Sequence, residues 1–369
     1  MGEKVRVGLV YGGRSGEHEV SLQTALAVMK AFNYDKYEIK PFYIGKNGEW
    51  RSGQTLLAAP TDLELLRLAG GDSTSGTEAL MPVFDSAPAV VDGADAKPLD
   101  VVFPLLHGTF GEDGTIQGLF EMANIPYVGA GVLASAVGMD KILMKKVFAQ
   151  EGLPQCVFRY FNRTQWEKDR AFFIMEIEVA LGYPCFIKPA NLGSSVGISK
   201  ARNREELIEA VNYAFRFDRK VIVEEFVDAR EIEVSVLGND EPRASVPGEI
   251  ASSNEFYDYK AKYIDGKSQM HIPANIPAET AQAVRDMAIR AFQAIDGSGL
   301  SRVDFFMRKD DGALFINEVN TMPGFTPYSM YPLMWKETGV SYQELLDTLI
   351  ELAIARHAEK QRIDYGGGN

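Results

Sequence analysis

Two segments near the carboxyl end of the chain carry acidic and amide side chains at alternating positions. Arg302 and Asp304 stand two positions apart in the first segment, and Glu318 and Asn320 do so in the second. Residues two apart on a β-strand share a face, and a hairpin centred on residue 311 would set Asp304 opposite Glu318. Arg302 would then lie opposite Asn320. Carboxylate and amide oxygens suit Mg2+, so we predict a Mg2+ site here; the alternative is a solvated hairpin face with a surface ion pair.

Residues 188–197 have the composition of a loop that could close over phosphate groups. Lys188 ends an apolar, strand-like run, and small residues rich in glycine and serine follow it. Glycine lets the backbone approach an anion closely, and the backbone N–H groups can bind its oxygens. A plain turn between two strands is the alternative. The combination of a lysine with a glycine-rich loop favours phosphate binding.

The same loop also matches the pattern of a hydrolase nucleophile. Residues 193–197 read G-x-S-x-G with Ser195 at the centre, and Asp304 and His357 follow in the order that a hydrolase needs. Such a serine must lie directly between a strand and a helix. Here residues 198–201 read as extended, and the next helical pattern waits until Asn203. The match is therefore predicted to be accidental.

Two further residues are candidates only in combination. His107 follows an apolar segment and precedes a helical pattern, which is the edge where open α/β sheets bind ligands. Glu17 stands in the first turn of a predicted helix, where it could merely complement the helix dipole. The chain has no dinucleotide fingerprint, and Ala261 replaces the first glycine of a P-loop. Hydride transfer and P-loop chemistry therefore lose support.

Composition sets the class of protein. The 369 residues are 46% hydrophobic and 24% charged, which is enough for two or three packed domains. The formal charge of -13 argues against nucleic acid binding. Apolar runs are too short for a membrane span and the start does not resemble a signal peptide, so we expect a cytoplasmic protein without membrane contact. Cys156 and Cys185 are expected to be packing residues.

The hydrophobic pattern predicts an α/β protein of several domains. In the first third, strands alternate with helical patterns, which favours an open parallel sheet with helices on its faces. The strands are expected at residues 6–11, 38–44 and 99–105, with a helix at 17–32. Residues 70–98 read as an irregular excursion. Later elements are expected as one helix from 131 to about 151, a helix from 203, and strands at 183–188, 220–225, 231–237, 301–307 and 313–320.

Read in order, six segments resemble the motif series of D-alanine:D-alanine ligases of the ATP-grasp superfamily. They are residues 11–22, 107–114, 139–141, 188–196, 256–263 and 317–324, and only the excursion at 70–98 is left uncovered. The resemblance implies a substrate-binding α/β domain followed by a two-subdomain ATP-grasp fold. The corresponding boundaries are 1–130, 131–222 and 223–369, with a lid loop at 249–272.

The resemblance also implies an ATP site with two Mg2+ ions, for which Mn2+ is able to substitute. Lys141 and Lys188 would contact the phosphates, and the loop with Ser194 and Ser195 would close over them. The residues implied to hold the rest of the nucleotide are Glu224, Glu225, Phe226 and Val227 by their backbone at the adenine, Glu231 at the ribose, and Lys262. The metal ligands would be Asp304, Glu318 and Asn320.

For the amino acids, the resemblance implies that Glu17 binds the ammonium group of the first D-alanine. His107 and Arg302 would face its carboxylate or the intermediate made from it. Arg302 would also stabilise an oxyanion together with the N–H of Gly324. The second D-alanine would lie at Ser329 and Met330.

Lid closure is implied to depend on Tyr263. Ser194 and Glu17 would link to this tyrosine by hydrogen bonds. A tyrosine at that position, with Lys262 beside it, favours D-alanine over D-lactate as the acceptor.

The reaction implied is ATP-dependent formation of D-alanyl-D-alanine through an acyl phosphate, for peptidoglycan precursor synthesis, by a homodimer. The alternatives are another ATP-grasp carboxylate ligase, a serine hydrolase and a non-catalytic nucleotide sensor.

Overall fold

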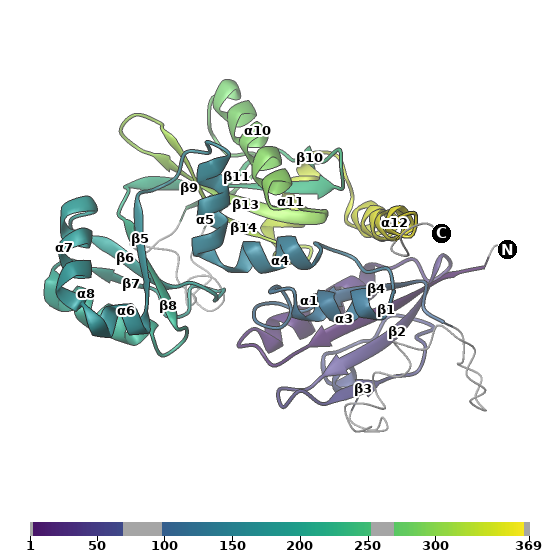
Figure 1. Ribbon diagram of the computed structural model, residues 1–369. Coiled ribbons are helices and arrows are strands. Elements are labelled where there is room, and N and C mark those ends of the chain that lie inside the picture. Colours follow the sequence, from purple (N-terminus) through teal and green to yellow (C-terminus); the bar gives the residue numbers. More distant parts are fainter. Residues whose placement is uncertain (1–2, 69–97, 252–268, 365–369) are drawn as a thin grey trace.

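The computed structural model describes residues 3–68, 98–251 and 269–364. Its strands form three sheets, which Figure 1 shows as three bodies: the N-terminal sheet at the lower right, the second at the left and the third at the top. Lys262 and Tyr263, and with them most of the expected lid, lie outside the described residues. So does the expected excursion at 70–98, except its last residue.

The N-terminal sheet has the strand order β3-β2-β1-β4. Its strands are β1 (Val5–Gly12), β2 (Tyr37–Ile44), β3 (Trp50–Ser52) and β4 (Val101–Leu105). β1 pairs in parallel with β2 and with β4, which confirms the prediction for these three strands. The edge strand β3 is antiparallel to β2 and is absent from the prediction, because three half-buried residues show no readable alternation.

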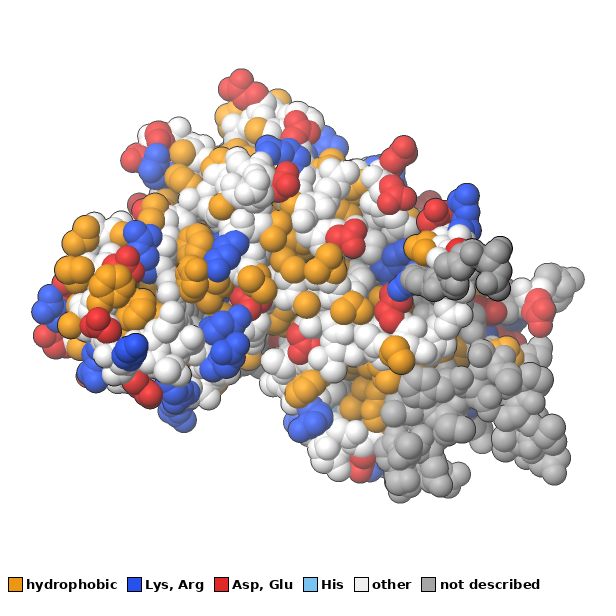
Figure 2. Space-filling view, viewed as in Figure 1, with side chains coloured by type: hydrophobic (Ala, Val, Ile, Leu, Met, Phe, Trp, Pro, Cys, Tyr) orange, Lys and Arg blue, Asp and Glu red, His pale blue; other side chains and the backbone are white. Residues whose placement is uncertain are grey.

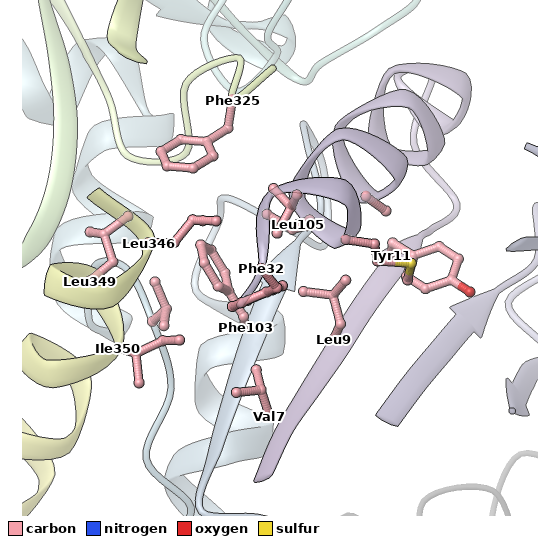
Figure 3. Packing of buried hydrophobic residues seen from close by; sticks show 14 of the residues in the cluster. Val7, Leu9, Tyr11, Phe32, Phe103, Leu105, Phe325, Leu346, Leu349 and Ile350 are labelled. Carbon is pink, nitrogen blue, oxygen red and sulfur yellow. The ribbon is translucent and has the colours of Figure 1, made fainter. Parts of the chain in front are cut away.

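Helices cover both faces of this sheet, as predicted. α1 (His18–Ala31) and the last helix, α12 (Tyr342–Lys360), share one core with the sheet, together with the short 3-10 helix η1 (Glu64–Arg67); α3 (Thr115–Met122) lies in the core of the other face. Figure 3 shows Leu346, Leu349 and Ile350 of α12 facing Phe103 of β4. The end of the chain therefore packs on its first domain.

The second sheet is antiparallel, in the order β5-β8-β6-β7. It consists of β5 (Phe158–Asn162), β6 (Cys185–Pro189), β7 (Ser199–Ala201) and β8 (Lys220–Glu225), covered by α6 (Arg163–Lys168), α7 (Arg170–Ala180) and α8 (Arg204–Ala214). Cys185 is buried in its core, as expected for a packing residue. Asn203 accepts a hydrogen bond from the N–H of Glu206 and so caps α8.

The third sheet carries the predicted hairpin. Its order is β12-β11-β9-β13-β14, with β10 paired to β9. The strands are β9 (Ala229–Gly238), β10 (Arg243–Ala244), β11 (Gly248–Ala251), β12 (Gln269–His271), β13 (Gly299–Arg308) and β14 (Leu314–Asn320). α10 (Ala278–Ala294) packs on one face, and α11 (Met330–Glu337) contacts β9 and β11 from the other.

The single helix predicted from residue 131 to about 151 is wrong. The structure has two helices, α4 (Val132–Met139) and α5 (Lys141–Gln150), separated by Asp140. Asp140 is extended, and its carboxylate accepts hydrogen bonds from the N–H groups of Ile142 and Leu143, which makes it the cap of α5. An aspartate within a helical pattern is a cap signal that outweighed the hydrophobic periodicity.

The packing also bears on the expected domain boundaries. The boundary at residue 222 falls inside β8, which is a strand of the second sheet. Met144 and Phe148 of α5 lie in the core of the third sheet, although the boundaries assign them to the central subdomain. We propose that α4 and α5 belong structurally with the third sheet.

On the face shown in Figure 2, acidic, basic and hydrophobic side chains are interspersed. Within residues 3–68, 98–251 and 269–364, every helix is too short or too polar to cross a lipid bilayer.

Candidate active site

Two adjoining cavities collect the predicted site residues. The first has a volume of about 400 Å³ and the second about 640 Å³, and both are lined by Lys141, Ser195 and Glu318. The predicted residues lining only the first are Glu17, His107, Ser194, Arg302, Asn320, Gly324, Ser329 and Met330. Those lining only the second are Lys188, Glu224, Glu225, Phe226, Val227, Glu231 and Asp304. Every predicted site residue that the structure describes thus lies on one site.

The hairpin has the predicted register. Asp304 pairs with Glu318 and Arg302 with Asn320, and a bulge follows Asp304. The guanidinium of Arg302 donates to both oxygens of Asp304, from Nε to Oδ1 at 2.7 Å and from a terminal nitrogen to Oδ2 at 2.6 Å. The Arg302 and Asp304 side chains are 16% and 14% exposed, so the alternative of a solvated surface ion pair is wrong. Lys141 Nζ lies 3.8 Å from Glu318 Oε2.

Glu233 is a second anionic neighbour of Arg302 that the sequence analysis missed. Its Oε2 lies 3.1 Å from Arg302 Nε, and it pairs with Asp304 across the β9–β13 ladder. Burial alone would lower the pKa of Arg302, but the charges of Asp304 and Glu233 outweigh this effect and raise the pKa well above its ordinary value. The alternation of Glu231 and Glu233 along one face of β9 was the available signal.

A buried charge cluster lies beneath the second cavity. Lys188 Nζ donates to Glu224 Oε2 at 2.5 Å, and Lys145 Nζ lies 3.1 Å from Glu224 Oε1. Burial opposes ionisation of Glu224, but Lys145 and Lys188 outweigh it and lower its pKa to about 2. The structure therefore shows the Glu224 side chain facing the lysines. Lys145 was missed, although it stands four residues after Lys141 on the same face of α5.

The loop after β6 joins the two cavities. Ser194 and Ser195 have left-handed backbone conformations, with φ of 53° and 57°. Lys141 Nζ donates to the carbonyl of Leu192 at 2.8 Å, and the Ser194 hydroxyl donates to Glu17. These bonds tie the loop to α5 and to the N-terminal domain. Because β7 follows the loop and α8 begins only at Arg204, Ser195 does not form a strand-to-helix elbow.

The hydrolase alternative also fails because its histidine lies outside both cavities. His357 lies on α12, where its Nε2 is 3.1 Å from the carbonyl oxygen of Asn124. Neither His357 nor Asn124 lines either cavity, whereas Ser195 lines both.

His107 is buried at the floor of the first cavity, at 4% exposure. Its Nδ1 lies 3.1 Å from the carbonyl oxygen of Met322 and its Nε2 lies 3.1 Å from Thr24 Oγ1. Burial lowers the pKa of His107, although the charge of Glu17 and the bond to Met322 act in the opposite direction. The imidazole is therefore neutral at physiological pH.

Glu112 lines the same cavity and was not predicted as a site residue. Its Oε1 accepts from the N–H of Gly108 at 2.7 Å, and its Oε2 accepts from the N–H of Met322 at 3.4 Å. Burial and the charge of Glu17 raise the pKa of Glu112 to about 8, against these bonds and the charge of Arg302. The signal was its position in the segment that contains His107.

The far wall of the first cavity is formed by the turn that follows β14. The Oγ of Ser329 accepts from the N–H of Thr326 at 3.1 Å, and a side chain added at Gly324 would lie 3.2 Å from this oxygen. Met330 begins α11 and is buried against Ile250. Gly324, Ser329 and Met330 therefore border one small volume.

The family model described as D-ala D-ala ligase N-terminus matches residues 6–130, and that described as D-ala D-ala ligase C-terminus matches residues 147–351. The chain belongs to the D-alanine–D-alanine ligase family. Within this family it is 56% identical to a D-alanine–D-alanine ligase from Bacillus cytotoxicus over 98% of this chain and 99% of that one. A Bacillus velezensis relative of the same name is 55% identical, over 96% and 99% of the two chains.

Solved ligase structures have the same fold. The D-alanine-D-alanine ligase from Coxiella burnetii superimposes with a TM-score of 0.78 at 33% identity, covering 98% of this chain and 97% of that one. The VanG D-Ala:D-Ser ligase from Enterococcus faecalis gives 0.79 at 37% identity, covering 95% and 100%. These likenesses confirm the predicted ATP-grasp fold of this ligase-family chain.

Proposed function

We propose that this protein joins two D-alanine molecules into D-alanyl-D-alanine, with conversion of ATP to ADP and phosphate, for peptidoglycan precursor synthesis. The observation that carries the proposal is the pair of cavities that share Lys141 and Glu318. One cavity has the cations and loop of a nucleotide site, and the other has a carboxylate and a guanidinium suited to an amino acid. A phosphoryl group transferred at their junction would reach the amino acid directly.

In the second cavity, Lys188 and Lys141 would bind the ATP phosphates under the loop with Ser194 and Ser195. The left-handed backbone conformations of Ser194 and Ser195 turn the loop so that its N–H groups can face one anion. The backbone from Glu224 to Val227 would hold the adenine and Glu231 the ribose, since all of them line this cavity. Lys262 would act at the same site from the lid.

The hairpin fits Mg2+ by the chemistry of its donors. Asp304 and Glu318 offer carboxylate oxygens and Asn320 an amide oxygen, all hard ligands on neighbouring strands. ATP phosphates and water would complete the coordination of two Mg2+ ions, or of Mn2+ in their place. Bound there, the ions would neutralise charge on the phosphates during transfer.

The first cavity supplies the residues for the amino acids. Glu17 would hold the ammonium group of the first D-alanine, and Arg302 would attract its carboxylate, one oxygen of which attacks the γ-phosphorus as ADP leaves. The amine of the second D-alanine, held at Ser329 and Met330, then attacks the acyl carbon. Arg302 and the Gly324 N–H would stabilise the resulting oxyanion until phosphate leaves and the amide forms. In this step the attacking amine transfers its proton to the leaving phosphate.

Water must be kept from the acyl phosphate, which otherwise hydrolyses. We assign this task to the lid at 249–272, with Tyr263 linked to Ser194 and Glu17 when it closes. Tyr263→Phe should weaken closure and lower turnover. Unchanged steady-state kinetics in this variant would refute the role of Tyr263.

D-alanine is the acceptor that the similarities favour. The chain is 53–56% identical to several relatives named D-alanine–D-alanine ligase, over 96–98% of its length. We further propose a homodimer that works in the cytoplasm, where ATP is available.

Mass analysis of the products tests the acceptor. With Mg-ATP and an equimolar mixture of D-alanine, D-serine and D-lactate, D-alanyl-D-alanine should dominate. A dominant D-alanyl-D-serine or D-alanyl-D-lactate would show that the second subsite has been misassigned.

A further inference from the structure

The backbone of Met322 is held on both sides by one loop of the N-terminal domain. Its carbonyl oxygen lies 3.1 Å from His107 Nδ1, and its N–H donates to Glu112 at 3.4 Å. The other oxygen of Glu112 accepts from the N–H of Gly108 at 2.7 Å, which fixes the carboxylate within its own loop. Loop and turn are more than 200 residues apart in sequence, since Met322 is 215 positions from His107.

The hydrogen bonds of His107 determine its tautomer. A carbonyl oxygen can only accept, so Nδ1 carries the proton that is donated to Met322. The unprotonated Nε2 then accepts from the hydroxyl of Thr24, 3.1 Å away. Both ring nitrogens therefore have protein partners. A substrate carboxylate would have to displace one of them, which argues for a structural task in place of direct binding.

The turn is anchored again just beyond the site. Phe325 is fully buried in the core of the N-terminal domain, where its ring centroid lies 6.1 Å from that of Phe103. Figure 3 shows Phe325 projecting from the turn toward this core. Gly324, whose N–H is assigned to the oxyanion, thus lies between two anchors: the hydrogen-bonded backbone of Met322 and the buried ring of Phe325.

We propose that His107 and Glu112 are positioning residues that clamp the backbone of Met322 and so aim the Gly324 N–H at the oxyanion of the amide-forming step. The inference rests on the proposed ligase function. An enzyme with a loosened clamp still forms the acyl phosphate, because its nucleotide cavity is intact. Amide formation slows, and water consumes part of the acyl phosphate before the second amino acid does.

The ratio of phosphate released to dipeptide formed reports this directly. Glu112→Gln should raise the ratio clearly above one. The amide has only one oxygen to accept from the N–H groups of Gly108 and Met322, and its NH2 group faces the other N–H, so one hydrogen bond is lost. The kcat for dipeptide should fall about 10-fold or more, with the KM for ATP within about twofold. Glu121→Gln is the matched control, because Glu121 bonds Tyr127 and Lys360 away from the cavities. Its ratio should stay at one.

Thr24→Val is the second variant, in case Glu112→Gln does not fold. It removes the partner of His107 Nε2 and leaves Glu112 intact. It should raise the same ratio to a smaller extent. A ratio of one in every folded variant, whether kcat is unchanged or falls together with the melting temperature, would overturn the proposal. If the wild type releases no phosphate in response to D-alanine, the proposed function itself fails, which is a separate result.

Discussion

The hydroxyl of Ser194 donates a hydrogen bond to the carboxylate of Glu17, across 177 positions of sequence. Ser194 belongs to the loop that follows β6, and Glu17 directly precedes α1. The residue proposed to hold the substrate ammonium is therefore in contact with the loop proposed to cover the ATP phosphates. Binding of the two ligands should be coupled through this contact.

Ser194→Ala removes that coupling. A hydrogen bond to a charged group contributes about 1.5–3 kcal/mol, so kcat/KM for D-alanine should fall about 10- to 100-fold. Steady-state kinetics at saturating Mg-ATP would measure the change. The melting temperature should stay within a few degrees of the wild-type value. If kcat stays at the wild-type value, so that the two rates become equal at saturating D-alanine, Ser194 acts on binding alone.

Asp304→Asn should weaken the metal site. The substitution keeps the size of the side chain but removes one of the two carboxylates on the hairpin, so the Mg2+ concentration for half-maximal rate should rise at least about 10-fold. Calorimetric titration of Mg2+ into the protein with a non-hydrolysable ATP analogue gives an independent readout. Asp311→Asn, in the turn of the same hairpin and paired with Arg308, is the control. An equal shift in both variants would remove Asp304 from the metal site.

Glu224→Gln should destabilise the fold strongly. It leaves the buried ammonium groups of Lys145 and Lys188 without their counter-charge, for which the cost is about 3–5 kcal/mol. Urea unfolding would measure the free energy. Glu225→Gln should cost less than about 1 kcal/mol, because an amide oxygen can still accept from the N–H of Val157. Equal costs at the two positions would contradict the charge cluster.

Acid should destabilise the protein through the same group. The pKa of Glu224 is lowered from an ordinary 4.5 to about 2 in the folded protein. Its contribution is therefore complete above pH 4.5 and is lost as the pH falls from there towards 2. Glu224→Gln should show a smaller loss of unfolding free energy across this window. Identical slopes for both proteins would show that Glu224 is not ionised in the fold.

The contribution of Glu112 to stability should depend on pH in the opposite direction to that of Glu224. The pKa of Glu112 is raised from 4.5 to about 8, so the folded state binds the extra proton between these values. Its contribution to stability is complete below pH 4.5 and is lost as the pH rises to about 8. Comparing unfolding curves of the wild type and Glu112→Gln between pH 5 and 9 tests this. A difference that does not change with pH would contradict the raised pKa.

Local patterns were enough to predict the hairpin. The period of two along β13 and β14, with a polar turn between them, set Asp304 opposite Glu318, and the structure has that register. The parallel strands of the first sheet were equally readable. β1 and β4 are mainly apolar, and β2 alternates apolar and charged residues before its apolar end. The short edge strand β3 and the break at Asp140 could not be predicted in this way. β3 has too few residues to show a pattern, and the helical periodicity of the sequence continues across Asp140.

The buried charges were harder to find. Its spacing from Lys141 places Lys145 on the same face of α5 but does not show that this face is buried. Tertiary packing places Lys145 beside Glu224 in the core. The position of Glu112 in the site likewise depends on the turn at Met322, which lies against it while Phe325 packs in the N-terminal core. Such residues can be recognised as part of the site only in the folded structure, where segments distant in sequence lie together.

The most direct test of the account is phosphate release from Mg-ATP with D-alanine or with L-alanine, with the organic product identified by mass. A D-alanine–D-alanine ligase should release phosphate only when D-alanine is present, with one D-alanyl-D-alanine formed per phosphate, and none with L-alanine. Phosphate release that does not respond to either amino acid, or no release at all, would contradict it.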